Sequence, residues 1–374
     1  FLPGGAEPTG CCHGGKFYFV MPRHCFGPFR VCTYAPKIIF TIILKTFYLL
    51  SIRMCLCALT RAFEYHLLQY YPVVQLQLGK SIGMIVFSLS TQQIFTRLNG
   101  ALGNRNDHEL HVLQSGFMAA YSLFKLYAFS YLRFDECSAV IYTFPVWTTW
   151  MSFYFGGEAI NISNATLQIV NILAVTLIVD PLELWKKDEQ QFLRTLIGLA
   201  MAVASALCFS MQLFVMRFTG PSIQWCTCEL YAGFLSAIVI CPFVTLGQYL
   251  FGYPDAFLWE YIWVNLEIID VASITLVAIG TFISFGLINE GIKLAPVAPA
   301  AFCFLMGLPL TFILQCMIFG QNPDVFGWVG MSTLMASDFL IGHTNKHPTL
   351  TAQHRSIFPT QQMGVHMDPV QVNT

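Results

Sequence analysis

Two lysines stand inside otherwise apolar stretches of this 374-residue chain: Lys80 in the run 72–96 and Lys125 in the run 111–131. A charged group in such a segment costs at least about 2.5 kcal/mol unless it is paired or hydrated, so each lysine is a candidate binding residue. At about 1.5 Å of rise per residue, both lie roughly 10 Å below the same membrane surface. Two ammonium groups at one depth would attract an anionic solute. The alternative is that each side chain extends to the lipid headgroups.

A second polar group stands at the end of the apolar run 270–290, where Asn289 and Glu290 precede Lys293. Glu290 and Lys293 have the i,i+3 spacing of a local salt bridge, which suits the edge of a membrane. A role of Asn289 and Glu290 in gating or in proton coupling is the alternative interpretation.

Four more polar or amphipathic side chains lie inside apolar runs, namely Tyr142, Trp147, Asn171 and Gln212. Such groups either line a cavity for a solute or form hydrogen bonds between helices, and the sequence leaves both open. No nucleophile elbow, phosphate-binding glycine loop or His-Glu-x-x-His motif appears, so we expect no catalysis, no metal and no cofactor. The N-terminal Cys11-Cys12-His13 lacks the paired-ligand spacing of a structural zinc site.

Composition indicates the elements that position these residues. The chain is 56% hydrophobic and 10% charged, whereas soluble domains carry about 25% charged residues. The class indicated is an all-α integral membrane protein in a lipid bilayer, and the net charge of −1 gives no reason to expect nucleic acid. A spanning helix needs about 20 apolar residues. The candidate spans are 38–59, 72–96, 111–131, 137–156, 164–181, 195–216, 230–251, 270–290, 297–319 and 325–342.

Lysine and arginine concentrate in the segments that share a side with the N-terminus, so the positive-inside rule places both termini in the cytoplasm. The tails are then an N-terminal segment, 1–37, and a disordered C-terminal segment, 343–374. The membrane is the plasma membrane or an endomembrane such as the Golgi, which the sequence does not distinguish. A homodimer is likewise left open.

The fourth and ninth candidate spans share a pattern. Pro145 is followed ten residues later by Phe155-Gly156, and Pro309 is followed ten residues later by Phe319-Gly320. The chain therefore divides into two similar halves, 38–181 and 195–342. Because five spans per half is an odd number, the second half is inverted in the membrane, an arrangement typical of secondary transporters. Proline kinks a helix, so we expect Pro145 and Pro309 to act as hinges or to shape a cavity.

The segment Ala128–Pro181 resembles the end of an EamA repeat of the drug/metabolite transporter superfamily. The matching residues are Tyr131-Leu132, Pro145, Gly157-Glu158 and Pro181 in the first half, and Pro309, Phe319-Gly320 and Trp328 in the second. The second half departs from the pattern at Gln321-Asn322, where an acidic residue is usual. Among eukaryotic members the chain is most similar to solute carrier family 35 G-type proteins. The resemblance implies ten helices in two inverted repeats around a central cavity for a small organic solute.

The function expected from these features is secondary transport, or facilitated passage, of a small organic solute by alternating access. The cationic residues favour an anionic solute. The alternative is a non-transporting membrane scaffold or receptor that keeps the transporter fold. An intramembrane enzyme acting on lipid is the third class, and the scattered ionisable residues give it little support.

Overall fold

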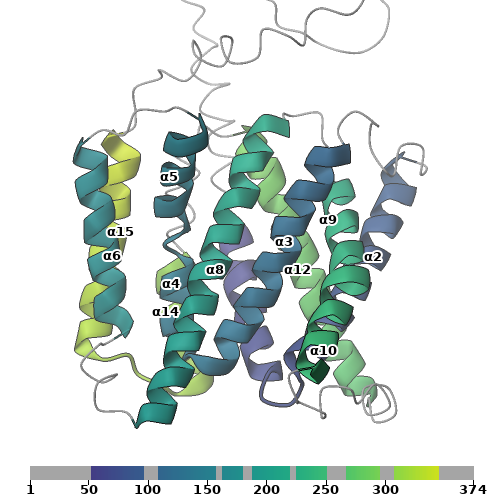
Figure 1. Cartoon of the computed structure of the whole chain (residues 1–374), viewed down its shortest axis with the longest axis horizontal. Helices are drawn as coiled ribbons and strands as arrows, with labels where there is room; N and C mark the ends of the chain where they lie inside the picture. The colour runs from purple at the N-terminus through teal and green to yellow at the C-terminus, as the bar shows by residue number, and fades with distance from the viewer. Residues whose placement is uncertain are drawn as a thin grey trace, which may run out of the picture. The chain divides into compact units, whose positions relative to one another are not determined.

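The computed structural model describes residues 52–96, 108–156, 162–179, 188–219, 225–250, 267–294 and 307–344, and these are helical apart from short turns. Figure 1 shows the helices standing side by side. A first helical segment covers 52–67. The helices that follow are α2 (Val73–Thr96), α3 (His108–Tyr131), α4 (Phe134–Ile141), α5 (Phe144–Gly156), α6 (Ile162–Val179), α8 (Glu189–Thr219), α9 (Trp225–Phe234), η2 (Leu235–Ile240), α10 (Cys241–Leu250), α12 (Ile268–Leu294), α14 (Gly307–Phe319) and α15 (Val325–Thr344).

Four helical stretches within the described residues are long and apolar enough to cross a membrane. They are Val73–Ile94, Glu189–Met216, Trp225–Gly247 and Ile268–Asn289. Shorter apolar helices cover Ala165–Val179, Gly307–Phe319 and Val325–Ser337. The all-helical architecture expected for a membrane protein is therefore confirmed at this level. The predicted tails fall outside the described residues, except that α15 continues to Thr344.

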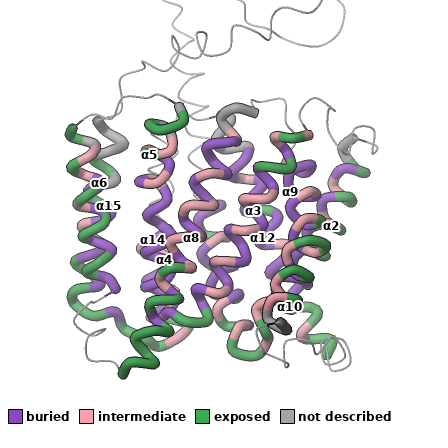
Figure 2. Tube along the Cα trace, viewed as in Figure 1, coloured by how far each residue is buried: buried purple, intermediate pink, exposed green. Residues whose placement is uncertain are grey.

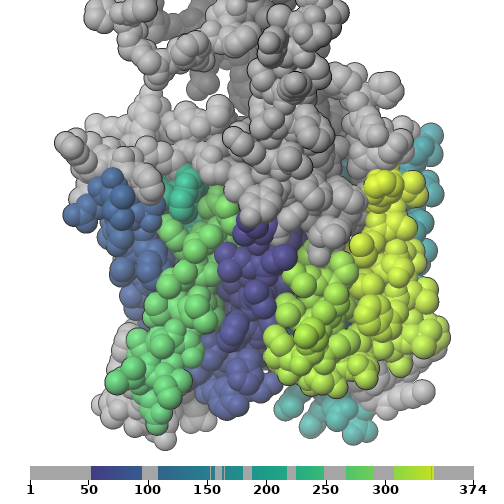
Figure 3. Space-filling model, turned by 180° about the vertical axis from the view of Figure 1, so that it is seen from behind, coloured from purple at the N-terminus to yellow at the C-terminus, as the bar shows by residue number. Residues whose placement is uncertain are grey.

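The first helical segment differs from its prediction. The apolar run was expected to end at residue 59, with Arg61 in a connection, but the helix continues to residue 67 and buries both Arg61 and Glu64. Figure 3 shows this segment between α12 and α14 on the face opposite that of Figure 1. Two glycines allow the close approach, since a Cβ at Gly280 would collide with Thr60 and one at Gly307 with Met54.

The turn after the first helical segment is tied to the start of α12. The phenol of Tyr71 donates a hydrogen bond to Asp270, and burial together with this bond raises the pKa of Tyr71 to about 12. Asp270 also accepts a hydrogen bond from the backbone N–H of Glu267, at 2.9 Å. This contact holds 52–67, α2 and α12 together at one end of the bundle.

The kink that we expected at Pro145 within a continuous helix is not observed. Pro145 stands instead at the beginning of a new helix. The predicted span 137–156 is divided at Tyr142-Thr143 into α4 and α5, and Pro145 is the second residue of α5. A proline in the first turn of a helix loses no intrahelical hydrogen bond, because the first N–H groups have no partner there. Pro309 is the third described residue of α14.

The segment 225–250 contains a change in helical winding. It passes from α9 through the π-helix η2 into α10. π-Helical turns are rare inside α-helices and occur frequently at functional sites. The wider winding begins one residue before Ser236, which is buried and faces α2.

Aromatic side chains pack α3, α5 and α8 together. The ring of Phe209 on α8 lies 4.9 Å from that of Tyr121 and 4.8 Å from that of Phe144, between ring centroids. The Ser205 hydroxyl donates to the Tyr121 carbonyl and the Ser210 hydroxyl to the Phe144 carbonyl. Figure 2 shows buried residues along the facing sides of these helices.

Helices α6 and α15 pack against each other through a small residue and a hydrogen bond. Ser337 on α15 donates to the amide oxygen of Asn171 on α6, so Asn171 has the packing role that the sequence left open. A Cβ added at Gly330 would stand 2.6 Å from the Ala174 carbonyl oxygen and 2.7 Å from Ile178 Cγ1. Small residues that let backbones approach closely are typical of helix pairs in membranes.

We expect Gly330→Ala to force α6 and α15 apart and to lower the free energy of unfolding by about 1–3 kcal/mol, as overpacking does. Thermal denaturation in detergent measures the loss. Gly116→Ala on α3 is the matched control, because its Cβ meets nothing within 4 Å. It should leave stability unchanged or raise it by up to about 1 kcal/mol. Equal melting temperatures for the two variants would contradict the close contact.

Candidate functional site: a buried charge cluster

A single carboxylate joins the two lysines that the sequence singled out. Glu64 on the first helical segment lies 3.0 Å from Lys80 Nζ through Oε1 and 2.5 Å from Lys125 Nζ through Oε2. The side chains of Glu64 and Lys80 are 0% exposed and that of Lys125 is 6% exposed. The alternative that either lysine extends to the headgroups is therefore not observed, since both side chains turn inward to the same carboxylate.

A chain of hydrogen bonds continues from this cluster across the bundle. Lys80 Nζ donates to the Ser122 hydroxyl, which donates to Gln77 Oε1 at 2.9 Å. Gln77 Nε2 then donates to the Ser236 hydroxyl on η2 at 2.7 Å. The cluster and this relay thus connect the first helical segment, α2, α3 and η2.

Arg61 extends the positive charge one helical turn from Glu64. Its Nη2 donates to the hydroxyl of Tyr121 at 3.0 Å, and its guanidinium lies 4.9 Å from the centroid of the Tyr142 ring. The Lys125 ammonium lies 5.5 Å from the centroid of the Tyr121 ring. Within the described residues, Arg61 Nε and Nη1 and the Tyr142 hydroxyl have no hydrogen-bond partner.

The charges of this cluster do not balance. Arg61, Lys80 and Lys125 carry three positive charges, against one negative charge on Glu64. Buried charges are strongly unfavourable unless they are paired, so an excess of cations favours occupation by an anion. The planar guanidinium, held by Tyr121 and Tyr142, leaves Nε and Nη1 as donors that can bind carboxylate or phosphate oxygens.

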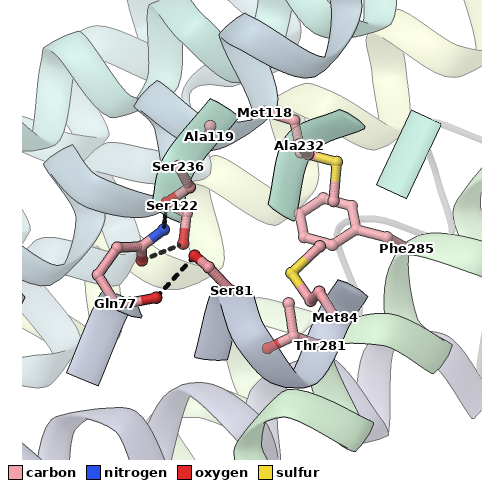
Figure 4. A pocket seen from close by; sticks show the side chains of 10 residues that line it. All are labelled: Gln77, Ser81, Met84, Met118, Ala119, Ser122, Ala232, Ser236, Thr281 and Phe285. Carbon is pink, nitrogen blue, oxygen red and sulfur yellow. Dashed lines mark hydrogen bonds between the residues drawn. The ribbon is translucent and has the colours of Figure 1, made fainter. Parts of the chain in front are cut away.

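A small cavity adjoins the relay (Figure 4). Its lining residues come from four elements, α2, α3, the α9–η2 segment and α12, and they are Gln77, Ser81, Met84, Met118, Ala119, Ser122, Ala232, Ser236, Thr281 and Phe285. The cavity leaves about 10 Å³ for the centre of a water-sized molecule, which is room for about one water. A solute larger than water therefore requires these helices to move apart.

The other sequence candidates occupy varied positions. Gln212 on α8 is buried, and neither amide atom has a hydrogen-bond partner among the described residues. Trp147 is half-buried and donates locally to the Thr143 hydroxyl at 3.0 Å. Asn289 is buried near the end of α12, whereas the side chain of Glu290 lies outside the described part.

Sequence reasoning therefore found the two lysines and Tyr142 but missed Glu64 and Arg61. Both missed residues lie just beyond the predicted end of the first span. The signal available was helical spacing, since Arg61, Glu64 and Leu68 recur at intervals of three and four residues, as on one face of a helix.

Comparison with known proteins bears on the fold. No family model matches the chain, and no curated protein matches it. Solved structures do match, among them one titled only "Crystal structure of protein", which aligns over 82% of this chain and 99% of its own length with a TM-score of 0.54. The sequence identity is 14%, so this similarity concerns the fold alone.

Proposed function

We propose that this protein is a secondary transporter or facilitator that moves a small organic anion across a membrane. The observation that carries the proposal is the buried cluster of Arg61, Lys80, Lys125 and Glu64, in which positive charge exceeds negative charge. Ionisable residues inside apolar helices are rare and typically mark a path for a substrate or an ion. The relay from this cluster to Ser236 joins helices that are distant in sequence.

An inverted repeat of five and five spans is part of the proposal, and helix packing supports it. In that numbering α2, α3 and α12 are spans two, three and eight, and α8 and α9 belong to spans six and seven. In such a repeat α2 corresponds to α9, and α12 corresponds to α3. The contact between α2 and α12 therefore predicts an equivalent contact between α9 and α3, and both contacts are observed. Likewise α8 corresponds to the first helical segment. The contact between α3 and α8 therefore predicts a contact between α12 and the first helical segment, which is the one between Gly280 and Thr60.

Membership of the EamA-type drug/metabolite transporters, with similarity to solute carrier family 35 G-type proteins, remains a proposal that rests on the sequence pattern. The matched spacing of Pro145 to Phe155-Gly156 and of Pro309 to Phe319-Gly320 agrees with it, since both prolines lie in helices of the described chain. The helices that meet at the cavity are those that alternating access would have to separate.

Counterflow in proteoliposomes tests transport. We expect vesicles preloaded with the right unlabelled anion to accumulate its labelled form, since a carrier exchanges solute across both membrane faces. The panel contains organic anions, nucleotides, amino acids and neutral sugars, and vesicles without protein are the control. Exchange confined to anions supports the proposal. Exchange of neutral sugars alone would contradict the role of the charge cluster in binding an anion. The absence of exchange across the whole panel would favour the scaffold alternative.

A further inference from the structure

The face of α9 and η2 that lines the cavity carries a buried carboxyl group one helical turn away. Glu229 precedes Ala232 by three residues and Ser236 by seven, and both of these line the cavity. Spacings of three, four and seven residues fall on one face of a helix. Glu229 is 0% exposed, and neither carboxyl oxygen has a hydrogen-bond partner among the described residues.

The part of α9 that carries Glu229 is tightly packed against its neighbours. Gly233, one turn further along α9, leaves so little space that an added Cβ would stand 3.0 Å from the Ser81 carbonyl oxygen and 2.8 Å from Ile85 Cγ1 on α2. On the other side, the carbonyl of Cys228 accepts a hydrogen bond from the Ser115 hydroxyl of α3 at 2.8 Å. The residues on either side of Glu229 in α9 therefore contact α2 and α3.

The described basic groups of α2 and α3 contact residues other than Glu229. On α3, His111 Nδ1 lies 3.4 Å from Cys228 Sγ, His108 Nδ1 lies 2.7 Å from the Tyr231 hydroxyl, and Lys125 is paired with Glu64. On α2, Lys80 contacts Glu64 and Ser122.

Helix α12 brings uncharged residues to this region. Thr281 and Phe285 line the cavity, and the Trp225 ring of α9 covers Gly286. The side chain of Glu290, further along α12, is outside the described part. Among the described residues neither carboxyl oxygen of Glu229 has a partner, and a buried carboxyl group that is unpaired takes up a proton rather than remain ionised.

Hydroxyl groups line the cavity between the face of α9 that carries Glu229 and the charge cluster. Ser81 and Ser88 stand seven residues apart on α2 and share a face, and Ser88 Oγ and Thr281 Oγ1 have no hydrogen-bond partner in the described part of the chain. The cavity that Ser81 and Thr281 line has room for about one water. From the cavity a chain of hydrogen bonds reaches Lys80 through Ser236, Gln77 and Ser122.

We propose that Glu229 is a proton-binding site of this carrier, protonated in the closed conformation and ionised when the helices around the cavity part and admit water. The carboxylate and one proton combine to form the O–H bond of the acid, and the reverse step returns that proton to water. We further infer that proton binding is coupled to transport, so that one proton accompanies the anion and offsets one of its negative charges. This coupling rests on the proposed function.

Infrared difference spectroscopy of the purified protein in lipid nanodiscs tests the proton site without any solute. At neutral pH the wild-type protein should show a carboxylic-acid C=O band that shifts in D₂O. Glu229→Gln should remove this band, whereas Glu109→Gln, an exposed residue on α3 at the same end of the bundle, should retain it. A band that persists in Glu229→Gln, or one that sodium ions abolish in the wild type, would overturn proton binding.

Proteoliposomes then test coupling, with the anion that exchanges in the counterflow panel. Glu229→Gln should retain solute exchange, because the amide resembles the protonated acid, but should lose accumulation driven by a pH gradient and fall to the level of protein-free vesicles. Accumulation equal to wild type would overturn coupling. If the wild type shows no exchange at all, the proposed function fails, and the infrared result still decides whether Glu229 holds a proton.

Discussion

Replacement of Glu64 by glutamine should lower the free energy of unfolding by about 3–5 kcal/mol, the cost of removing one partner of a buried ion pair. Glu64 compensates Lys80 and Lys125 at once, with side-chain exposures of 0% for Glu64 and Lys80. The amide leaves two buried ammonium groups with no counter-charge. We expect a large drop in the melting temperature of the purified protein in detergent.

A double-mutant cycle makes this prediction specific. Lys80→Met alone leaves Glu64 with Lys125 as a neutral pair, so it should cost less than Glu64→Gln. Added to Glu64→Gln, it removes one of the two uncompensated charges and should restore part of the lost stability, a coupling that only interacting residues show. Glu189→Gln, at the exposed start of α8, is the control and should melt as the wild type does. Additive effects of the two cluster mutations would contradict the bridge.

The second large effect is expected on transport. Lys125→Met should weaken the apparent affinity for the transported anion by about 30-fold or more, because truncating a buried charged partner costs about 2–5 kcal/mol and each 1.4 kcal/mol is tenfold. The concentration dependence of exchange in proteoliposomes measures this as a rise in KM. Lys125→Arg keeps the charge and should retain more of the affinity.

Two controls separate binding from folding. Arg194→Met removes an exposed cation at the start of α8 and should leave KM unchanged. The melting temperature of Lys125→Met shows whether the variant is folded, and Glu64 keeps Lys80 as a partner in it. A folded Lys125→Met protein with wild-type KM would remove Lys125 from the binding site.

The sequence alone indicated an all-helical membrane protein, because 10% charged residues cannot cover a soluble surface and the apolar runs are long enough for helices. It also singled out Lys80 and Lys125, since a charge in an apolar run stands out whatever its partners. The sequence also indicated that the helix path changes at Pro145, but it did not indicate that one helix ends and another begins there. The chain breaks at Tyr142-Thr143 and restarts, because proline suits the first turn of a helix better than its middle.

Only the tertiary structure decided where the two lysines point and what holds them. Hydropathy sums a local window, so Arg61 and Glu64 looked like the end of a span. In the folded chain Lys80 and Lys125 compensate the charge of Glu64, and Arg61 donates a hydrogen bond to Tyr121, so contacts with residues distant in sequence let the helix continue. A buried charge is tolerated when its partner is buried with it. That partner comes from another helix, which no local pattern reveals.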